Sequence, residues 1–383
     1  MTTPDPATIL NQDAWLSWIE IDVEAVRHNF RLFRSLVPAT TALFAVVKAD
    51  AYGHGAIPVA QALTQEGADI LCVARVEEAL ELRAAGIETP ILVFAPPFAP
   101  QAMAAAGKNI SLTIASVEHL AAVSQAVAAT GADIPVHIKV DVGMGRLGIA
   151  PSDALTLAQV MLGRPGIVLA GVMTHFPCAD SGQKEITLKQ LESFLEVRRA
   201  FHDAGIFPRF FHCANSAAAL DFPESHLDAI RPGISLYGLM PSPDVVARPD
   251  LRPAMHLRSR ITFLKEVSAS TPLSYGGTFV TSRPSRIATV PVGYADGYPR
   301  QAGNHATGLL HGQRVAQVGR VCMDQILLDV TDVKEVSTGD TVTLFGQDNG
   351  DFLTAEELAV AAGTIGYEIT TRIGKRLPRY LRG

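Results

Sequence analysis

The sequence has few cysteines, and they form no pattern that indicates a metal site. Its 383 residues include four cysteines, which lie far apart along the chain at Cys72, Cys178, Cys213 and Cys322. No Cys-x-x-Cys motif and no paired histidine spacing suggests zinc. We therefore expect buried, reduced thiols and no metal.

Runs of basic residues and long apolar stretches are also missing. The 32 basic and 38 acidic residues give a net charge of −6, and without a Lys/Arg cluster the chain is not expected to bind nucleic acid. No stretch approaches the roughly 18 apolar residues that span a bilayer. The start, MTTPDPATILNQDAW, has no basic segment followed by an apolar core. These absences predict a cytoplasmic protein with no membrane partner, acting on a small molecule.

The first part of the chain alternates short strand-like runs with helical patterns. Between Asp22 and Gly238 the runs are TALFAVV, ADILCVA, PILVFA, ISLTI, VHIKVDV, IVLAGVMTH, FFHCA and ISLYG. They are almost continuously apolar, as in a parallel sheet buried on both faces. Eight such units in about 220 residues favour a closed (β/α)8 TIM-type barrel over an open doubly wound sheet.

The pattern changes after Gly238. PSPDVVARPDLRP contains four prolines and is typical of a linker, and the shorter strands that follow predict a mainly antiparallel β domain. We place the barrel at residues 14–240 and the β domain at residues 241–383. The early run LSWIEID lies outside the barrel repeat, so residues 14–22 could pair with the second domain. Thr354 and Glu357 form a capping box that opens a helix.

Lys48 follows the first predicted barrel strand. Active sites of such barrels form at the carboxyl ends of the strands. Burial there removes water from the lysine, which lowers its pKa and makes the neutral amine available for a Schiff base. The alternative is a lysine that reaches out of the strand end into solvent.

Other polar residues are predicted at the same rim. His175 and Asn215 follow the sixth and seventh predicted strands, and Arg231 is expected at the entry to the eighth. The hydroxyl of Ser216 and the backbone amides of Gly233 and Ile234 would donate to a phosphate. A lysine beside a phosphate cradle predicts a phosphorylated aldehyde cofactor, pyridoxal 5'-phosphate (PLP).

Nearly the whole chain, from Ala14 to Leu381, resembles the alanine racemases, which are PLP enzymes with a barrel followed by a β domain. The most specific segment is AVVKADAYGHGA, which is similar to the PLP-lysine motif of the family. The supporting segments are HIKVDVGMGRLG, MTHF, HCANSA, IRPGISLYG, LSYGGTF, VGYADGYPR, GRVCMDQ and IGYEI.

The resemblance implies two bases, on opposite faces of the substrate Cα. Lys48 would bind PLP and act on one face, while Tyr275 would enter from a partner subunit and act on the other, which implies a homodimer. Two bases are needed because one base alone returns the proton to the face it came from. Both must be tuned, because their reference pKa values are about 10.4 and about 10.

The resemblance also implies roles for the residues that hold the cofactor and the substrate. Arg231 would face the pyridine nitrogen with His175 beside the ring, and Arg146 would meet the phenolic oxygen and the substrate carboxylate. Met323 would offer its N–H to that carboxylate. The residues that would hold the cofactor through its phosphate or nearby are Tyr52, Asn215, Ser216, Gly233, Ile234 and Tyr367.

Lys139 lies on a buried strand, where a lysine without an anion is costly. The matching lysine of the family is often carbamylated, and the carbamate fixes the arginine seven residues later, here Arg146. We expect carbamylation, with an ordinary ion pair to Asp141 as the alternative. His54 and His212 are expected to be structural. Tyr294, Arg300 and Arg379 match positions that line the substrate's route of access, although solvated surface positions would look the same.

Arg231 favours racemisation over decarboxylation. An arginine cannot accept the proton of the pyridinium nitrogen, so the ring stays neutral and the carbanion is short-lived. The predicted function is interconversion of L- and D-alanine, supplying D-alanine for peptidoglycan. The alternatives are a broader racemase acting on serine or another amino acid, and a non-enzymatic PLP-binding protein.

Overall fold

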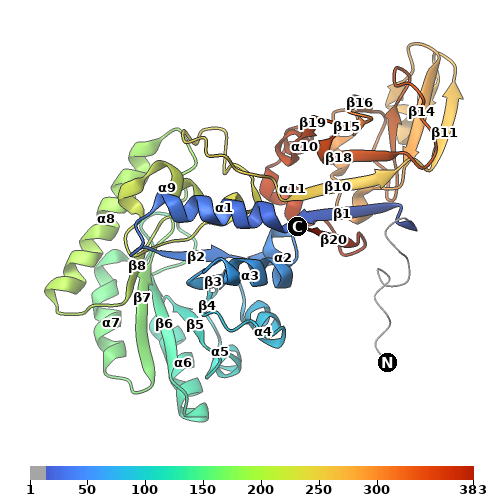
Figure 1. Ribbon diagram of the computed structural model, residues 1–383. Coiled ribbons are helices and arrows are strands. Elements are labelled where there is room, and N and C mark those ends of the chain that lie inside the picture. Colours follow the sequence, from blue (N-terminus) through green and yellow to red (C-terminus); the bar gives the residue numbers. More distant parts are fainter. Residues whose placement is uncertain (1–13) are drawn as a thin grey trace. The chain divides into compact units, whose positions relative to one another are not determined.

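The computed structural model describes residues 14–383, which form two compact units (Figure 1). The barrel unit contains residues 25–51 and 55–252. The sheet unit contains residues 14–24, 52–54 and 253–383. The first 13 residues lie outside the described part of the chain. They include most of the segment MTTPDPATILNQDAW, in which the sequence shows no basic segment followed by an apolar core.

Eight parallel strands close the barrel unit. Each pairs with the next in chain order, and the last returns to the first. They are β2 (Ala42–Val46), β3 (Ile70–Val73), β4 (Ile91–Val93), β5 (Ile110–Ile114), β6 (Ile134–Lys139), β7 (Ile167–Met173), β8 (Phe210–His212) and β9 (Ala229–Ile230). Most of their residues are buried, as expected for strands covered on one face by helices and filling the barrel with the other.

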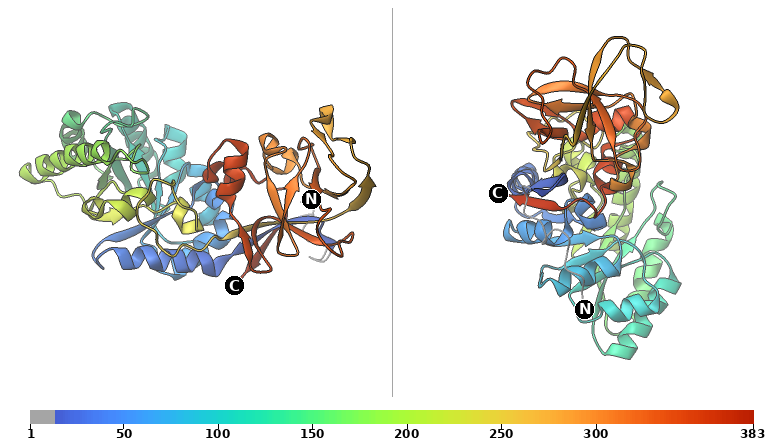
Figure 2. Two further views of the ribbon diagram at one scale, coloured as in Figure 1. Left: turned by 90° about the horizontal axis from the view of Figure 1, so that it is seen from above. Right: turned by 90° about the vertical axis from the view of Figure 1, so that its right-hand side faces the viewer.

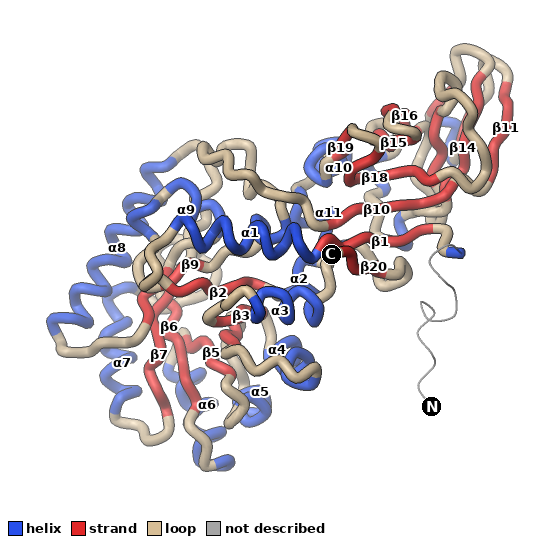
Figure 3. Tube along the Cα trace, in the orientation of Figure 1, coloured by secondary structure: helices blue, strands red, loops and turns tan. Residues whose placement is uncertain are grey.

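Helices surround these strands, as the blue tubes outside the red strands show (Figure 3). Helix α6 illustrates how the sequence builds them: Ser116 caps its first turn by accepting from the amide of His119, and Gly131 ends it with a φ of 69°. The helices are α1 (Val23–Leu36), α3 (Ala56–Gln65), α4 (Val76–Ala84), α5 (Ala99–Ala105), α6 (Val117–Thr130), α7 (Ala154–Leu162), α8 (Lys184–Asp203) and α9 (Ser216–Asp221).

The eighth strand was placed wrongly from the sequence. ISLYG forms a 3-10 helix, Ile234–Tyr237, and the barrel closes instead through the two-residue strand β9. Pro232 and Gly233 separate the two, and a proline in mid-strand would remove a ladder hydrogen bond. Arg231 therefore follows the last strand at its carboxyl end and does not lead into it.

The sheet unit is built on a ten-stranded sheet, counted over the described residues, in the order β11-β14-β17-β16-β15-β18-β10-β1-β20, with β19 beside β18. Most pairs are antiparallel, and β1 lies between β10, its antiparallel partner, and β20, its parallel one (Figure 1). Figure 2 shows the chain from two further directions. The strands are β1 (Ser17–Asp22), β10 (Met255–Arg260), β11 (Phe263–Val267), β14 (Ser285–Val290), β15 (Thr307–Leu310), β16 (Gln313–Gln317), β17 (Ile326–Asp329), β18 (Thr341–Asp348), β19 (Asp351–Leu353) and β20 (Arg379–Arg382).

A small hairpin and two helices complete the sheet unit. The hairpin joins β12 (Pro272–Leu273) to β13 (Phe279–Val280), and the helices are α10 (Ala355–Ala362) and α11 (Gly366–Arg372). The predicted capping box of α10 is confirmed: Thr354 Oγ1 accepts from the Glu357 amide at 2.9 Å, and Glu357 Oε1 accepts from the Thr354 amide at 3.1 Å. A closed parallel barrel followed by a mainly antiparallel sheet confirms the predicted fold class.

Across the part of the chain that the structure describes, no helix is both long enough and apolar enough to cross a membrane.

Candidate active site

Lys48 opens a left-handed turn at the carboxyl end of β2. The short element α2 (Lys48–Tyr52) has φ between 52° and 54° at four consecutive residues, Ala49 to Tyr52, none of them glycine. Each non-glycine residue in this region costs roughly 1–2 kcal/mol, so such runs need support from surrounding contacts. Within the barrel unit, Ala51 N donates to Val47 O at 2.9 Å, and Asp50 Oδ1 accepts from Ala56 N at 2.7 Å.

The environment of Lys48 favours its neutral amine. Burial is the main cause of its lowered pKa, and the positive charge of Arg146 lowers it further, while the carboxylate of Glu78 opposes the change. Arg146 is itself exposed. A half-buried lysine with a lowered pKa at a barrel rim has the properties expected of a nucleophilic amine.

Arg231 is buried at the same rim, with an exposed fraction of 4%. Its Nη2 donates to Thr174 O at 2.7 Å and Cys213 O at 3.0 Å, and its Nη1 donates to His212 Nδ1 at 2.8 Å. His175 Nδ1 lies 3.5 Å from Nη2. These contacts satisfy a permanent charge that would otherwise be costly to bury.

The contact with Arg231 determines where the protons of two further histidines lie. Arginine only donates, so His212 must accept at Nδ1 and carry its proton on Nε2. That nitrogen lies 2.9 Å from His137 Nδ1, which accepts in turn. Burial and the charge of Arg231 lower the pKa of His137 to about 3 and that of His212 well below its usual range. The line from Arg231 through His212 to His137 is therefore a chain of neutral imidazoles.

His212 was expected to be structural, and His137 was not predicted to take part at all. The signal for His137 is its place two residues before Lys139 on β6, because alternate residues of a strand share a face. The pairing itself could not be read from the sequence. On the neighbouring strand β7, a Cβ at Gly171 would lie 2.5 Å from His137 Nδ1, so this position requires glycine.

The predicted phosphate cradle comes together around Ser216. Its Oγ accepts from the amide of Gly233 at 2.8 Å, joining the loops that follow β8 and β9. Asn215 caps α9: its Oδ1 accepts from Ala218 N at 3.0 Å and its Nδ2 donates to Phe176 O at 3.3 Å. Asn215 thus shapes the loop that presents Ser216.

Lys139 is 7% exposed at the end of β6, and its Nζ donates to Val140 O at 3.4 Å. Burial and the charge of Arg231 lower its pKa to about 7. The carboxylate of Asp141, the alternative partner, accepts three backbone amides, from Gly143, Met144 and Gly145, at 2.7–2.9 Å. Asp141 therefore organises the loop that leads to Arg146.

Four of the residues predicted to contact the cofactor or the substrate belong to the sheet unit. The rings of Tyr52 and Tyr367 lie 6.2 Å apart between centroids. Tyr275 is 70% exposed and Met323 is 53% exposed, and their loops meet where Ser274 Oγ donates to Arg320 O at 2.7 Å and lies 3.5 Å from Cys322 Sγ. The sheet unit thus presents Tyr275 and Met323 on adjacent loops.

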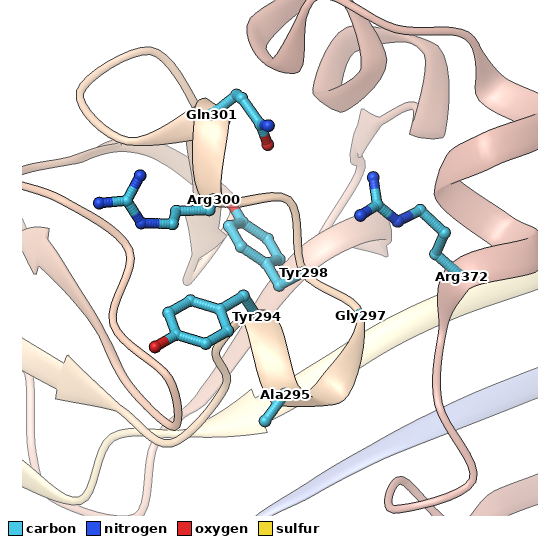
Figure 4. A pocket seen from close by; sticks show the side chains of 7 residues that line it. All are labelled: Tyr294, Ala295, Gly297, Tyr298, Arg300, Gln301 and Arg372. Carbon is cyan, nitrogen blue, oxygen red and sulfur yellow. The ribbon is translucent and has the colours of Figure 1, made fainter.

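A pocket in the sheet unit includes Tyr294 and Arg300, two of the predicted access residues (Figure 4). Arg372 lies on its opposite side, and the ring of Tyr298 lies between. Arg379, the third predicted access residue, instead donates from Nε to Gly53 O at 2.9 Å and from Nη2 to Ile373 O at 3.0 Å. Its guanidinium therefore binds backbone within the sheet unit and is not a solvated surface group.

Apart from the three access residues, the predicted site residues thus fall into two sets. Those of the barrel unit gather at its carboxyl rim: Lys48, Lys139, Arg146, His175, Asn215, Ser216, Arg231, Gly233 and Ile234. Those of the sheet unit are Tyr52, Tyr275, Met323 and Tyr367. Within residues 14–383, no group of three or more His, Cys, Asp or Glu side chains is placed to hold a metal ion.

Comparison with known proteins identifies the family of both parts of the chain. Residues 21–241 match the family model for the alanine racemase N-terminal domain, and residues 254–381 match that for the C-terminal domain. Alanine racemases of Desulfovibrio desulfuricans and Methanococcus maripaludis are 44% and 42% identical; each alignment covers 94% of this chain and 97% of that protein.

Solved structures give the same result. The alanine racemase of Streptomyces lavendulae has a TM-score of 0.90 at 38% identity, over 96% of this chain and 97% of that one. That of Bacillus anthracis with bound L-Ala-P has a TM-score of 0.90 at 37% identity, over 96% and 95%. With both domains matched over nearly the full length, this chain belongs to the alanine racemase family of isomerases.

Proposed function

We propose that this chain interconverts L- and D-alanine with pyridoxal 5'-phosphate bound to Lys48, as a cytoplasmic homodimer that supplies D-alanine for peptidoglycan. The observation that carries the proposal is Lys48 itself, a half-buried lysine with a lowered pKa at the barrel rim that also bears Arg231 and the Ser216–Gly233 contact. The names of the relatives, and the L-Ala-P bound to the Bacillus anthracis protein, support alanine as the substrate.

The donor set at the rim fits a phosphorylated pyridine aldehyde. The Ser216 hydroxyl and the backbone amides of Gly233 and Ile234 are suited to a phosphate, with Tyr52, Asn215 and Tyr367 as further holding residues. Arg231 donates and cannot accept, which suits an unprotonated ring nitrogen. When bound, the cofactor would supply an aldehyde for amine exchange and a ring that withdraws electrons from Cα.

The chain's own residues would move the protons. Lys48, whose pKa is lowered by burial and by the charge of Arg146, would remove or return a proton on one face of Cα. Tyr275 would do so on the opposite face. Arg146 and the N–H of Met323 would hold the substrate carboxylate, and His175, kept neutral by burial and Arg231, would lie beside the ring. The phenol of Tyr275 is largely exposed within its own unit, which supports its insertion into a partner subunit's barrel.

The substrate is tested by incubating the protein with PLP and a panel of L-amino acids in D₂O. We expect L-alanine to lose optical activity while its Cα becomes deuterated, because each turnover exchanges the Cα proton with a residue that equilibrates with solvent. Polarimetry and proton NMR measure both. Equal rates with serine would support the broader racemase, and no exchange with any amino acid would contradict a racemase.

Replacing Lys48 with alanine should remove the covalent link to the cofactor and lower racemisation by at least about 10³-fold, because anchor and base are lost together. Borohydride reduction followed by peptide mass spectrometry should find the cofactor on Lys48 in the wild type. Lys189→Ala, an exposed lysine of α8, is the matched control. Cofactor retained covalently in Lys48→Ala would reject the assignment.

Replacing Tyr275 with phenylalanine should lower racemisation by about 10²–10⁴-fold with little loss of cofactor. We assign the Cα proton of L-alanine to Tyr275 and that of D-alanine to Lys48. In D₂O, exchange of the Cα proton of L-alanine should therefore be lost, while exchange from D-alanine should persist. Tyr380→Phe, a tyrosine of β20, serves as the control. Loss of cofactor in proportion to activity would contradict a role as a base.

Lys139 is expected to carry a carbamate. Its neutral amine would attack carbon dioxide to form N-carboxylysine with release of one proton, and the resulting anion would lie among the charges of Arg146 and Arg231 that now lower the pKa of the amine. A pKa of about 7 leaves much of the amine neutral at pH 8, whereas protonation should reduce carbamylation as the pH falls below about 7.

The measurement is carbon-13 NMR with labelled bicarbonate. A carbamate signal should be present at pH 8, weaken towards pH 6 and be missing in Lys139→Gln. A signal that persists in Lys139→Gln, or none in the wild type, would reject the modification.

A further inference from the structure

The left-handed turn after Lys48 depends on a contact from outside the turn. Its first residue, Ala49, has φ 54° and ψ 52°, and its amide donates to Glu78 Oε1 at 2.7 Å. Glu78 lies in the first turn of α4, after the next barrel strand, so this bond crosses from the loop after β2 to the loop after β3. Both residues belong to the barrel unit.

The other oxygen of Glu78 has a different task. Its Oε2 accepts from the amides of Ala74 at 2.6 Å and Arg75 at 3.0 Å. Arg75 is the N-cap of α4, so this half of the carboxylate acts as an ordinary helix cap. Capping does not explain the bond to Ala49, which lies 29 residues earlier in the chain. One carboxylate therefore joins two loops of the rim through three backbone donors, and bonds to a charged acceptor are strong.

The charge of Glu78 also acts on the lysine. Burial and Arg146 lower the pKa of Lys48, and Glu78 is the carboxylate that opposes them. The remaining neighbour with an effect, the thiol of Cys72, has its pKa raised by burial to about 12, so it is uncharged at neutral pH. Glu78 is thus the group that limits how far the amine is driven towards its neutral form.

We propose that Glu78 is a positioning residue for Lys48: its carboxylate fixes the backbone at Ala49, which sets the direction in which Lys48 leaves β2, and it balances the positive charge beside the amine. The importance of that direction for catalysis rests on the proposed function. The effects of Glu78 on the backbone at Ala49 and on the charge beside Lys48 do not depend on that function. Each can be measured without a substrate.

The first test is amide hydrogen exchange of the full-length chain, resolved at Ala49 by NMR or by peptide fragmentation. Glu78→Gln keeps only one accepting oxygen, so it can cap α4 or reach Ala49 but not both. We expect the Ala49 amide to exchange at least about tenfold faster in this variant. Glu77→Gln, the same change at the exposed neighbouring residue of α4, should leave exchange at Ala49 unchanged.

The second test is the pH dependence of Lys48 acylation by acetic anhydride in cofactor-free full-length protein, read by peptide mass spectrometry. Removing a nearby negative charge disfavours the ammonium, so the midpoint in Glu78→Gln should fall by about one pH unit. Glu77→Gln should match the wild type. Glu78→Asp keeps the charge on a shorter side chain, so its midpoint should stay near that of the wild type while the Ala49 amide is freed.

The positioning role is overturned if Glu78→Gln and Glu77→Gln give the same exchange at the Ala49 amide or the same acylation midpoint. The charge effect would also be overturned if the acylation midpoint fell as far in Glu78→Asp as in Glu78→Gln. If Glu78→Gln does not fold, hydrogen exchange at Ala49 is measured in Glu78→Asp instead. If both tests respond as expected but wild-type Lys48 takes up no PLP, the proposed function fails while the positioning role stands.

Discussion

The buried charge of Arg231 determines the protonation of the barrel rim. A guanidinium cannot give up its proton under ordinary conditions, so the groups around it must adapt. Together with burial it keeps His137, His175 and His212 neutral and lowers the pKa of Lys139 to about 7. The strands place carbonyls of Thr174 and Cys213 against it, so the barrel stabilises the cation and the cation in turn decides which neighbours can donate and which must accept.

The two units supply different kinds of group. The barrel unit contributes mostly buried residues, held by strand ends and by loops such as the one that Asp141 closes with three backbone bonds. The sheet unit contributes exposed side chains on adjacent loops, among them Tyr275 and Met323. An exposed loop suits a base that must approach the substrate from outside the barrel, because contact with a partner's surface can fix the position of the loop.

The sequence predicted the barrel and most of the rim because both follow from local patterns. Apolar β-branched runs mark strands, and Lys48 comes directly after one. The last strand was misplaced because β9 has only two residues, too few to show a pattern, whereas ISLYG is strongly apolar yet forms a 3-10 helix. The left-handed turn and its bond to Glu78, like the pairing of His137 with His212, depend on contacts between residues distant in sequence, which periodicity does not reveal.

The central position of β1 in its sheet has a consequence for biosynthesis. This strand precedes the barrel in the chain, yet it pairs with β10 more than 230 residues later and with β20 at Arg379–Arg382. Residues 25–252 can form their barrel as they emerge, since its strands pair in chain order and domains tend to fold as units. β1 has no partner strand until β10 has been made, and its other edge stays open until β20 follows. The chain therefore carries an unpaired strand while the whole barrel is being made, and shielding that strand from other chains becomes a requirement of its folding in the cell.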